Sequence, residues 1–142
     1  MDETYDGPFY QGFVFFLVSA NPQKGNHILT ITLQIDGFAA NAGILGTWRS
    51  QDNPASLRPV EGVIIQGGGG IECQWSSGQG GTNVLTGTLT YNPGRFTRFT
   101  GLGWPSAFLD GKVTAYDANG NDTGKGPGAV SGTGMRQIMI AP

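Results

Sequence analysis

Apolar and polar residues alternate along most of this chain, in short runs that glycine, proline and asparagine separate. The clearest run is residues 27–36. Its aliphatic side chains share one face, at Leu29, Ile31, Leu33 and Ile35, and its polar side chains share the other. A period of two predicts a half-buried β-strand. Residues 9–20 differ, because their middle is continuously apolar from Phe13 to Val18. This run predicts a strand buried on both faces.

The remaining runs are short and evenly spaced, and no helical period lies between them. They predict strands over residues 42–51, 60–66, 71–76, 84–91, 95–102, 108–116 and 130–140. Residues 52–56 are predicted to break the pattern, because Pro54 cannot donate to a ladder, and Asn119-Gly120 predicts a tight turn. Short connections require antiparallel neighbours. We therefore expect an all-β fold with residues 1–142 as one domain, a single antiparallel barrel of about eight or nine strands, with a two-sheet sandwich as the alternative.

The composition limits which partners the protein can bind and in which cellular compartment we expect it. Charged residues make up 13% of the 142 residues, the formal net charge is −2 and the pI is near 5.1. Lysine and arginine are scattered, so no basic field is present to attract nucleic acid. The apolar run in residues 13–18 is too short and too late for a secretory leader or a membrane span. The sequence predicts a cytoplasmic protein, with export by a route that needs no leader left open.

Few residues here can carry a reaction. Cys73 and His27 are the only cysteine and the only histidine, which excludes a disulfide framework, a multi-cysteine zinc site and any cluster of several histidines. His27, beside a turn, is expected to be solvated. The acids Glu61 and Glu72 each lie in an otherwise uncharged strand, Asp110 lies in a strand that also holds Lys112, and all three acids are expected to face solvent. We therefore assign no catalytic residue, no metal ligand and no cofactor.

Aromatic residues beside hydrogen-bonding side chains are the strongest sign of a binding site. A tryptophan near arginine or glutamine can hold a sugar ring or another flat ligand, although each of the three tryptophans can equally belong to the core. The candidate ligand-binding residues are Trp48, Arg49, Glu72, Gln74, Trp75, Tyr91 and Trp104.

Two family resemblances arise at the third predicted strand. Gly46-Thr47-Trp48, followed by residues 85–89 (Leu-Thr-Gly-Thr-Leu), resembles the Gly-x-Trp opening and later Leu-Thr-Gly strand of avidin-type barrels. A bacterial family of small β-rich proteins of undefined function is similar to this chain over residues 29–36, 43–48 and 51–54. Residues 103–105 show a weaker resemblance to the same family. Both resemblances imply a β-barrel fold, and neither transfers a site.

These observations favour a non-catalytic binding module that holds a carbohydrate, a small apolar molecule or a protein partner through loop and barrel-mouth aromatics. One alternative is a cofactor-free cyclase or isomerase, in which a barrel cavity orients the substrate and an inward acid such as Glu72 or Asp110 moves a proton. Another alternative is a self-assembling or toxin-like protein that forms homo-oligomers through its edge strands.

Overall fold

The chain forms a closed antiparallel barrel of eight strands in the part that the computed structural model describes, residues 10–34, 43–51, 53–65, 70–77, 79–92 and 106–137. Each strand pairs with the next one in sequence, and β1 pairs with β8 to close the ring. A short 3-10 helix, η1 (Pro22–Lys24), follows the first strand. The strands are β1 (Tyr10–Ser19), β2 (His27–Gln34), β3 (Gly43–Ser50), β4 (Asn53–Ile65), β5 (Gly70–Ser76), β6 (Thr82–Asn92), β7 (Ser106–Tyr116) and β8 (Gly128–Gln137).

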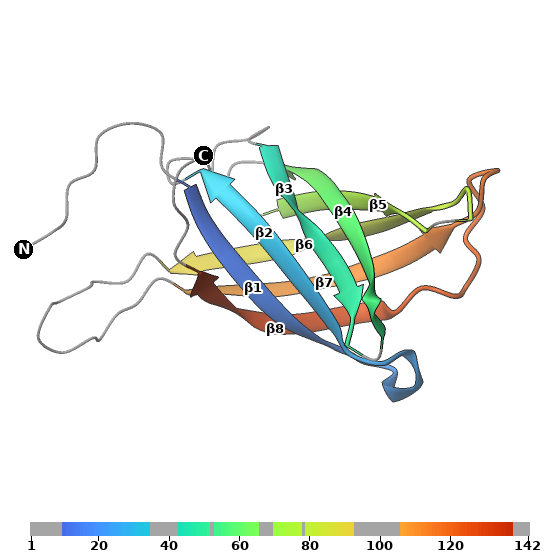
Figure 1. Ribbon diagram of the computed structural model, residues 1–142, viewed down its shortest axis with the longest axis horizontal. Coiled ribbons are helices and arrows are strands. Elements are labelled where there is room, and N and C mark those ends of the chain that lie inside the picture. Colours follow the sequence, from blue (N-terminus) through green and yellow to red (C-terminus); the bar gives the residue numbers. More distant parts are fainter. Residues whose placement is uncertain are drawn as a thin grey trace, which may run out of the picture.

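The predicted fold class is confirmed, with a closed barrel rather than an open sandwich. Figure 1 shows β1 to β4 forming one wall and β5 to β8 the other, and the two walls meet where β4 pairs with β5 and where β8 pairs with β1. The predicted break at residues 52–56 is wrong, since β4 already begins at Asn53. Pro54 is accommodated because it lies where the register between β3 and β4 shifts, between the pairs Trp48–Arg58 and Ser50–Asn53. The strand predicted over residues 95–102 lies outside the described residues.

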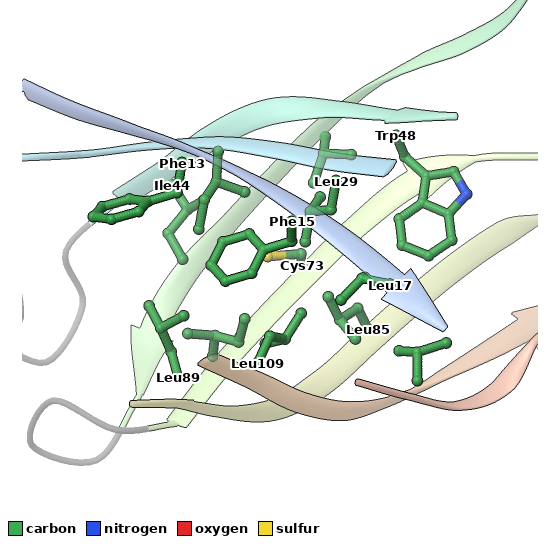
Figure 2. Packing of buried hydrophobic residues seen from close by; sticks show 14 of the residues in the cluster. Phe13, Phe15, Leu17, Leu29, Ile44, Trp48, Cys73, Leu85, Leu89 and Leu109 are labelled. Atoms are coloured by element: carbon green, nitrogen blue, oxygen red, sulfur yellow. The ribbon is translucent and has the colours of Figure 1, made fainter. Parts of the chain in front are cut away.

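The barrel interior is packed with side chains, so the described part encloses a core and not a lumen. Several large side chains are fully buried, with 0% of their surface exposed: Phe13, Phe15, Leu29, Leu85 and Leu109. Figure 2 shows such side chains converging from both walls. Small residues make room for the large ones. A Cβ on Gly134 would lie 2.6 Å from the ring of Phe15, which shows that the ring occupies the space above this glycine.

Strand β1 is buried on one face only, which corrects the expectation of burial on both faces. Phe13, Phe15 and Leu17 point into the core, whereas Phe16 and Val18 are 45% and 58% exposed. The reason is architectural, because a barrel is a single closed sheet, and no second layer covers its outer side. The continuous apolar run therefore supplies both a core face and an exposed apolar face.

Candidate functional site

Strands β4 and β5 pair over only part of their length, and the candidate site lies where they separate. Their ladder runs from Ile65 opposite Gly70 to Glu61 opposite Gln74. Beyond this pair β4 continues back to Asn53 beside β3, while β5 continues to Ser76 beside β6. In Figure 1 the beginning of β4 and the end of β5 diverge, so the barrel wall forks at the Glu61 and Gln74 pair.

A groove of about 520 Å³ occupies this fork, and we call it the β4–β5 groove. Its volume lies within the range of about 300–1,000 Å³ that is usual for ligand pockets. Strands β3 and β4 line one side, and β5, the β5–β6 turn and the start of β6 line the other. The lining residues are Leu45, Pro59, Val60, Glu61, Gln74, Trp75, Ser76, Gly80, Gly81 and Thr82.

The local sequence explains why β4 leaves its neighbour here. Pro59, opposite Thr47 of β3 and two residues before the last β4–β5 pair, has no N–H to donate to a neighbouring strand. The register shift opposite Arg49 places extra β4 residues against β3 between the pairs Trp48–Arg58 and Ser50–Asn53. Such a bulge bends the strand and increases its twist. The bend carries the first part of β4 away from β5.

Three stacked rings close the interior of the barrel behind the groove. The rings of His27 and Trp48 have centroids 4.8 Å apart and planes 23° apart, and the rings of Trp48 and Trp75 are 4.4 Å and 24° apart. The three residues belong to β2, β3 and β5, so the stack reaches across the place where β4 and β5 part. Trp75 lines the groove but is only 4% exposed. It therefore forms a rigid wall and does not offer an open platform.

Polar groups meet at the fork itself. The Gln74 side-chain Nε2 donates a hydrogen bond to Glu61 Oε1 over 3.5 Å, and both side chains are exposed. Further along the groove, Ser76 and Thr82 pair across β5 and β6, where the backbone N–H of Ser77 donates to the Gly81 carbonyl and closes the turn. The groove thus offers carboxylate and amide oxygens, an amide N–H₂ and hydroxyls beside apolar walls.

A second, smaller hollow of about 290 Å³ adjoins the groove along the β4–β5 ladder and shares Glu61 and Gln74 with it. It is lined by Glu61, Gly62, Val63, Glu72, Cys73 and Gln74. Glu72 is exposed on the outer side, while the Cys73 side chain points inward and is 0% exposed. Burial, together with the nearby Glu72 charge, raises the pKa of the Cys73 thiol from its ordinary value of 9.0 to about 12. The thiol is therefore protonated near neutral pH and is a poor nucleophile.

Of the predicted site residues, Gln74 and Trp75 line the groove, Trp48 stacks on Trp75 behind it, and Glu72 lines the adjoining hollow. Arg49 lies elsewhere, half-buried on β3 and not among the residues that line the groove. Tyr91 belongs to the other end of the barrel, since β6 rises about 26 Å from Asn83, the partner of Trp75, to Tyr91. Trp104 lies outside the described residues.

Sequence reasoning missed the groove residues that β3, β4 and the β5–β6 turn supply. Leu45, Glu61 and Gln74 follow one another across adjacent strands on the outer side, through the pairs Leu45–Glu61 and Glu61–Gln74. Alternation could have identified each outward position, but pairing between strands was needed to join them. His27 is a correction: it is 7% exposed and stacked on Trp48, and its Nε2 lies 3.2 Å from the Lys24 carbonyl oxygen.

No family model, curated protein or solved structure matches this chain. The resemblances to avidin-type barrels and to the bacterial β-rich family stay predictions. Within the described ranges, no group of three or more histidine, cysteine, aspartate or glutamate residues could hold a metal ion. The same part of the chain contains no helix that is long and apolar enough to cross a membrane.

Proposed function

We propose that this protein is a non-catalytic binding module whose β4–β5 groove takes a small, uncharged, hydroxylated ligand such as a sugar unit. The observation that carries the proposal is the fork itself, where the Glu61–Gln74 pair stands beside the Trp75 wall in a groove of ligand size. Sugars present hydroxyls that donate and accept hydrogen bonds, together with apolar C–H faces. A groove that combines both kinds of surface suits them.

The polar pair favours a hydroxylated ligand over an apolar one. The Gln74–Glu61 hydrogen bond is long at 3.5 Å and exposed, so the two side chains are already aligned but weakly joined. A ligand hydroxyl can donate to the Glu61 carboxylate while another accepts from the Gln74 amide. An apolar ligand would cover these groups without replacing their hydrogen bonds to water, which is unfavourable.

Several features argue for binding and against catalysis. The cavity enzyme requires an acid that faces a hollow interior, but Glu72 and Asp110 are both exposed on the outer side, and the described interior is filled by side chains. The Cys73 thiol is buried and protonated. His27 is held in the ring stack, with Trp48 on one face. None of these groups stands beside an activated nucleophile in the groove.

A screen of neutral mono- and oligosaccharides on an array, followed by calorimetry with any sugar that binds, tests the proposal. Loss of one neutral hydrogen bond costs about 1 kcal/mol, so Gln74→Ala should weaken binding roughly fivefold or more. The matched control is Gln23→Ala, which removes an exposed glutamine of η1 away from the groove. Equal affinities of the two variants, or a screen in which no sugar binds and tryptophan emission never changes, would reject the groove as a sugar site.

Binding of an apolar compound or a protein that Gln74→Ala leaves unchanged would also contradict the proposal, in favour of another occupant. Trp75→Phe provides a separate readout. It keeps an aromatic ring against Trp48 but removes the indole at the groove wall. Any change in tryptophan emission on sugar binding should therefore be much reduced in this variant.

A further inference from the structure

The outer side of β7, β8, β1 and β2 carries a broad apolar face. We call it the β1 face and define it by Val14, Phe16, Val18, Phe108, Thr133 and Met135. Four of these are large exposed apolar side chains: Phe16 at 45%, Val18 at 58%, Phe108 at 45% and Met135 at 62%. The pairs Val14–Met135 and Phe108–Thr133 show that these positions are neighbours across adjacent strands. The exposed residues therefore form one continuous surface.

The same face is free of charge in the described part of β8, β1 and β2. The outward residues there are valine, phenylalanine, isoleucine, threonine, serine, alanine and methionine. The first charged side chains appear at its border on β7, where Asp110 and Lys112 are exposed. By contrast, the outer side of β3, β4 and β5 carries Arg49, Glu61 and Glu72. Large exposed apolar side chains occur on β3 and β4 as well, at Leu45, Leu57 and Val63, but there they stand among charged neighbours, whereas those of β1 and β8 do not.

The extent of the face is enough for a specific dimer. Four neighbouring strands about 4.8 Å apart, with about nine residues each, span a surface of roughly 19 by 30 Å, or about 570 Å². Two such faces together bury about 1,100 Å², which is below a standard interface of about 1,600 Å² but above the ~1,000 Å² that a specific interface needs. Each half-exposed phenylalanine alone contributes about 90 Å² of a side chain that can bury about 200 Å². Patches of several hundred Å² on a monomer usually mark an interaction site.

We infer that the β1 face packs against the β1 face of a second copy of this chain, with a two-fold axis that runs across the strands at Phe16. The part of the face on β8, β1 and β2 carries no outward charge among the described residues, so two copies can meet there without opposing like charges, which is the condition for an isologous contact. The axis places Phe16 against its equivalent. It also places Val14 of one copy against Val18 of the other, since the two lie equally far from Phe16 along β1.

A hollow on the same face supports this arrangement. It has a volume of about 160 Å³ and is lined by Val18, Ser19, Ala20, Ala129, Val130 and Ser131, with Asp110 of β7 at its border. On β8, Met135 and Ser131 lie equally far from Thr133, so the two-fold axis sets Met135 of each copy over Ser131 of the other. The most exposed side chain of the face is then received by the hollow, twice per dimer.

The two grooves stay open in this dimer. In the ring of eight strands, the β4–β5 seam lies opposite the β8–β1 seam. The β4–β5 grooves of the two copies therefore lie on the far sides of the assembly. A dimer of this kind binds two ligands, or two units of one extended ligand, without any new contact at either groove.

Sedimentation velocity of the full chain tests the inference. The expected particle has twice the 14.9 kDa mass of one chain. Phe16→Glu should raise the dimer dissociation constant by about 100-fold or more, because it buries an unpaired carboxylate at the axis. Met135→Glu should act in the same direction and serves if Phe16→Glu unfolds, as judged by circular dichroism. The matched control is Leu57→Glu, which changes a 55% exposed leucine of β4 away from the face and should leave the dimer intact.

A wild-type chain that sediments as a monomer at every concentration would overturn the inference, as would a particle larger than a dimer. So would dissociation by Leu57→Glu equal to that by Phe16→Glu. The outcome is independent of the proposed sugar site. Gln74→Ala should keep the dimer, and Phe16→Glu should keep the affinity of each groove, so failure of either proposal is recognised separately.

Discussion

The buried thiol of Cys73 should be strongly protected from alkylation in the folded protein. Its pKa is raised from 9.0 to about 12, first by burial and second by the Glu72 charge. Only the thiolate reacts, and at pH 8 the difference of about three pKa units lowers the thiolate population about 1,000-fold relative to the unfolded chain. The side chain is also 0% exposed, so exclusion of the reagent adds to this factor.

The assay is the rate of reaction with iodoacetamide at pH 8, in buffer and in denaturant. We expect the native rate to be at least about 1,000-fold lower than the denatured rate. Leu57→Cys in a Cys73→Val background is the control, because position 57 is exposed and its thiol should react at nearly the denatured rate. Since burial is the larger cause, Glu72→Gln should accelerate native labelling by less than about tenfold. A native Cys73 rate within tenfold of the denatured rate would refute the packed interior at β5.

Three further outcomes follow from the core. Because unfolded Cys73 loses its proton near pH 9.0 and folded Cys73 near pH 12, the folded state is favoured below this window, and its free energy of unfolding should fall between them by about 1.4 kcal/mol per pH unit. Denaturant titrations should therefore show a free energy of unfolding that is about 1.4 kcal/mol lower at pH 10 than at pH 8 in wild type, because only the second of these two pH units lies above the unfolded pKa, and no such difference from this thiol in Cys73→Val. Gly134→Ala should cost about 1–3 kcal/mol by overpacking, while Gly43→Ala, with nothing within 4 Å of the added Cβ, should cost much less; similar costs would contradict the packing. Trp48→Ala should cost about 3–5 kcal/mol and shift Trp75 emission to longer wavelength in the folded protein, and an unchanged emission would contradict the ring stack.

Alternation along single strands predicted much of this fold. Leu29 and Ile31 of β2, and Ile44 and Trp48 of β3, share inner faces as the sequence indicates. This succeeds because a strand with one wet and one dry side must place its side chains with a period of two. Phe16 and Val18 were harder to predict, because a continuous apolar run is normally assigned to a strand that is buried on both faces. In a barrel one face of each strand points outward, and here that face is exposed.

The site was harder to predict, because it depends on pairs that are distant in sequence. Gln74 and Trp75 were identified as candidates from their aromatic and polar neighbours. Their partners Glu61 and Trp48 meet them only through the register of β4 with β5 and through a ring stack across the barrel. His27 was expected in solvent because it adjoins a turn, and its burial depends on the position of Trp48. These contacts join residues that are far apart in the sequence, so a pattern within one short segment cannot predict them.

The position and the chemistry of the groove have separate origins in the chain. A closed barrel normally leaves no strand edge unpaired, so an opening in its wall needs a cause within one of the two strands that flank it. Here β4 is the irregular strand, because it carries Pro59, which has no N–H to donate, and the register shift against β3 opposite Arg49, which bends it. Strand β5 remains regular and alternates between the inward Trp75 and the outward Gln74. An irregular strand therefore opens the wall, and the regular strand beside it supplies the aromatic wall and the amide of the groove.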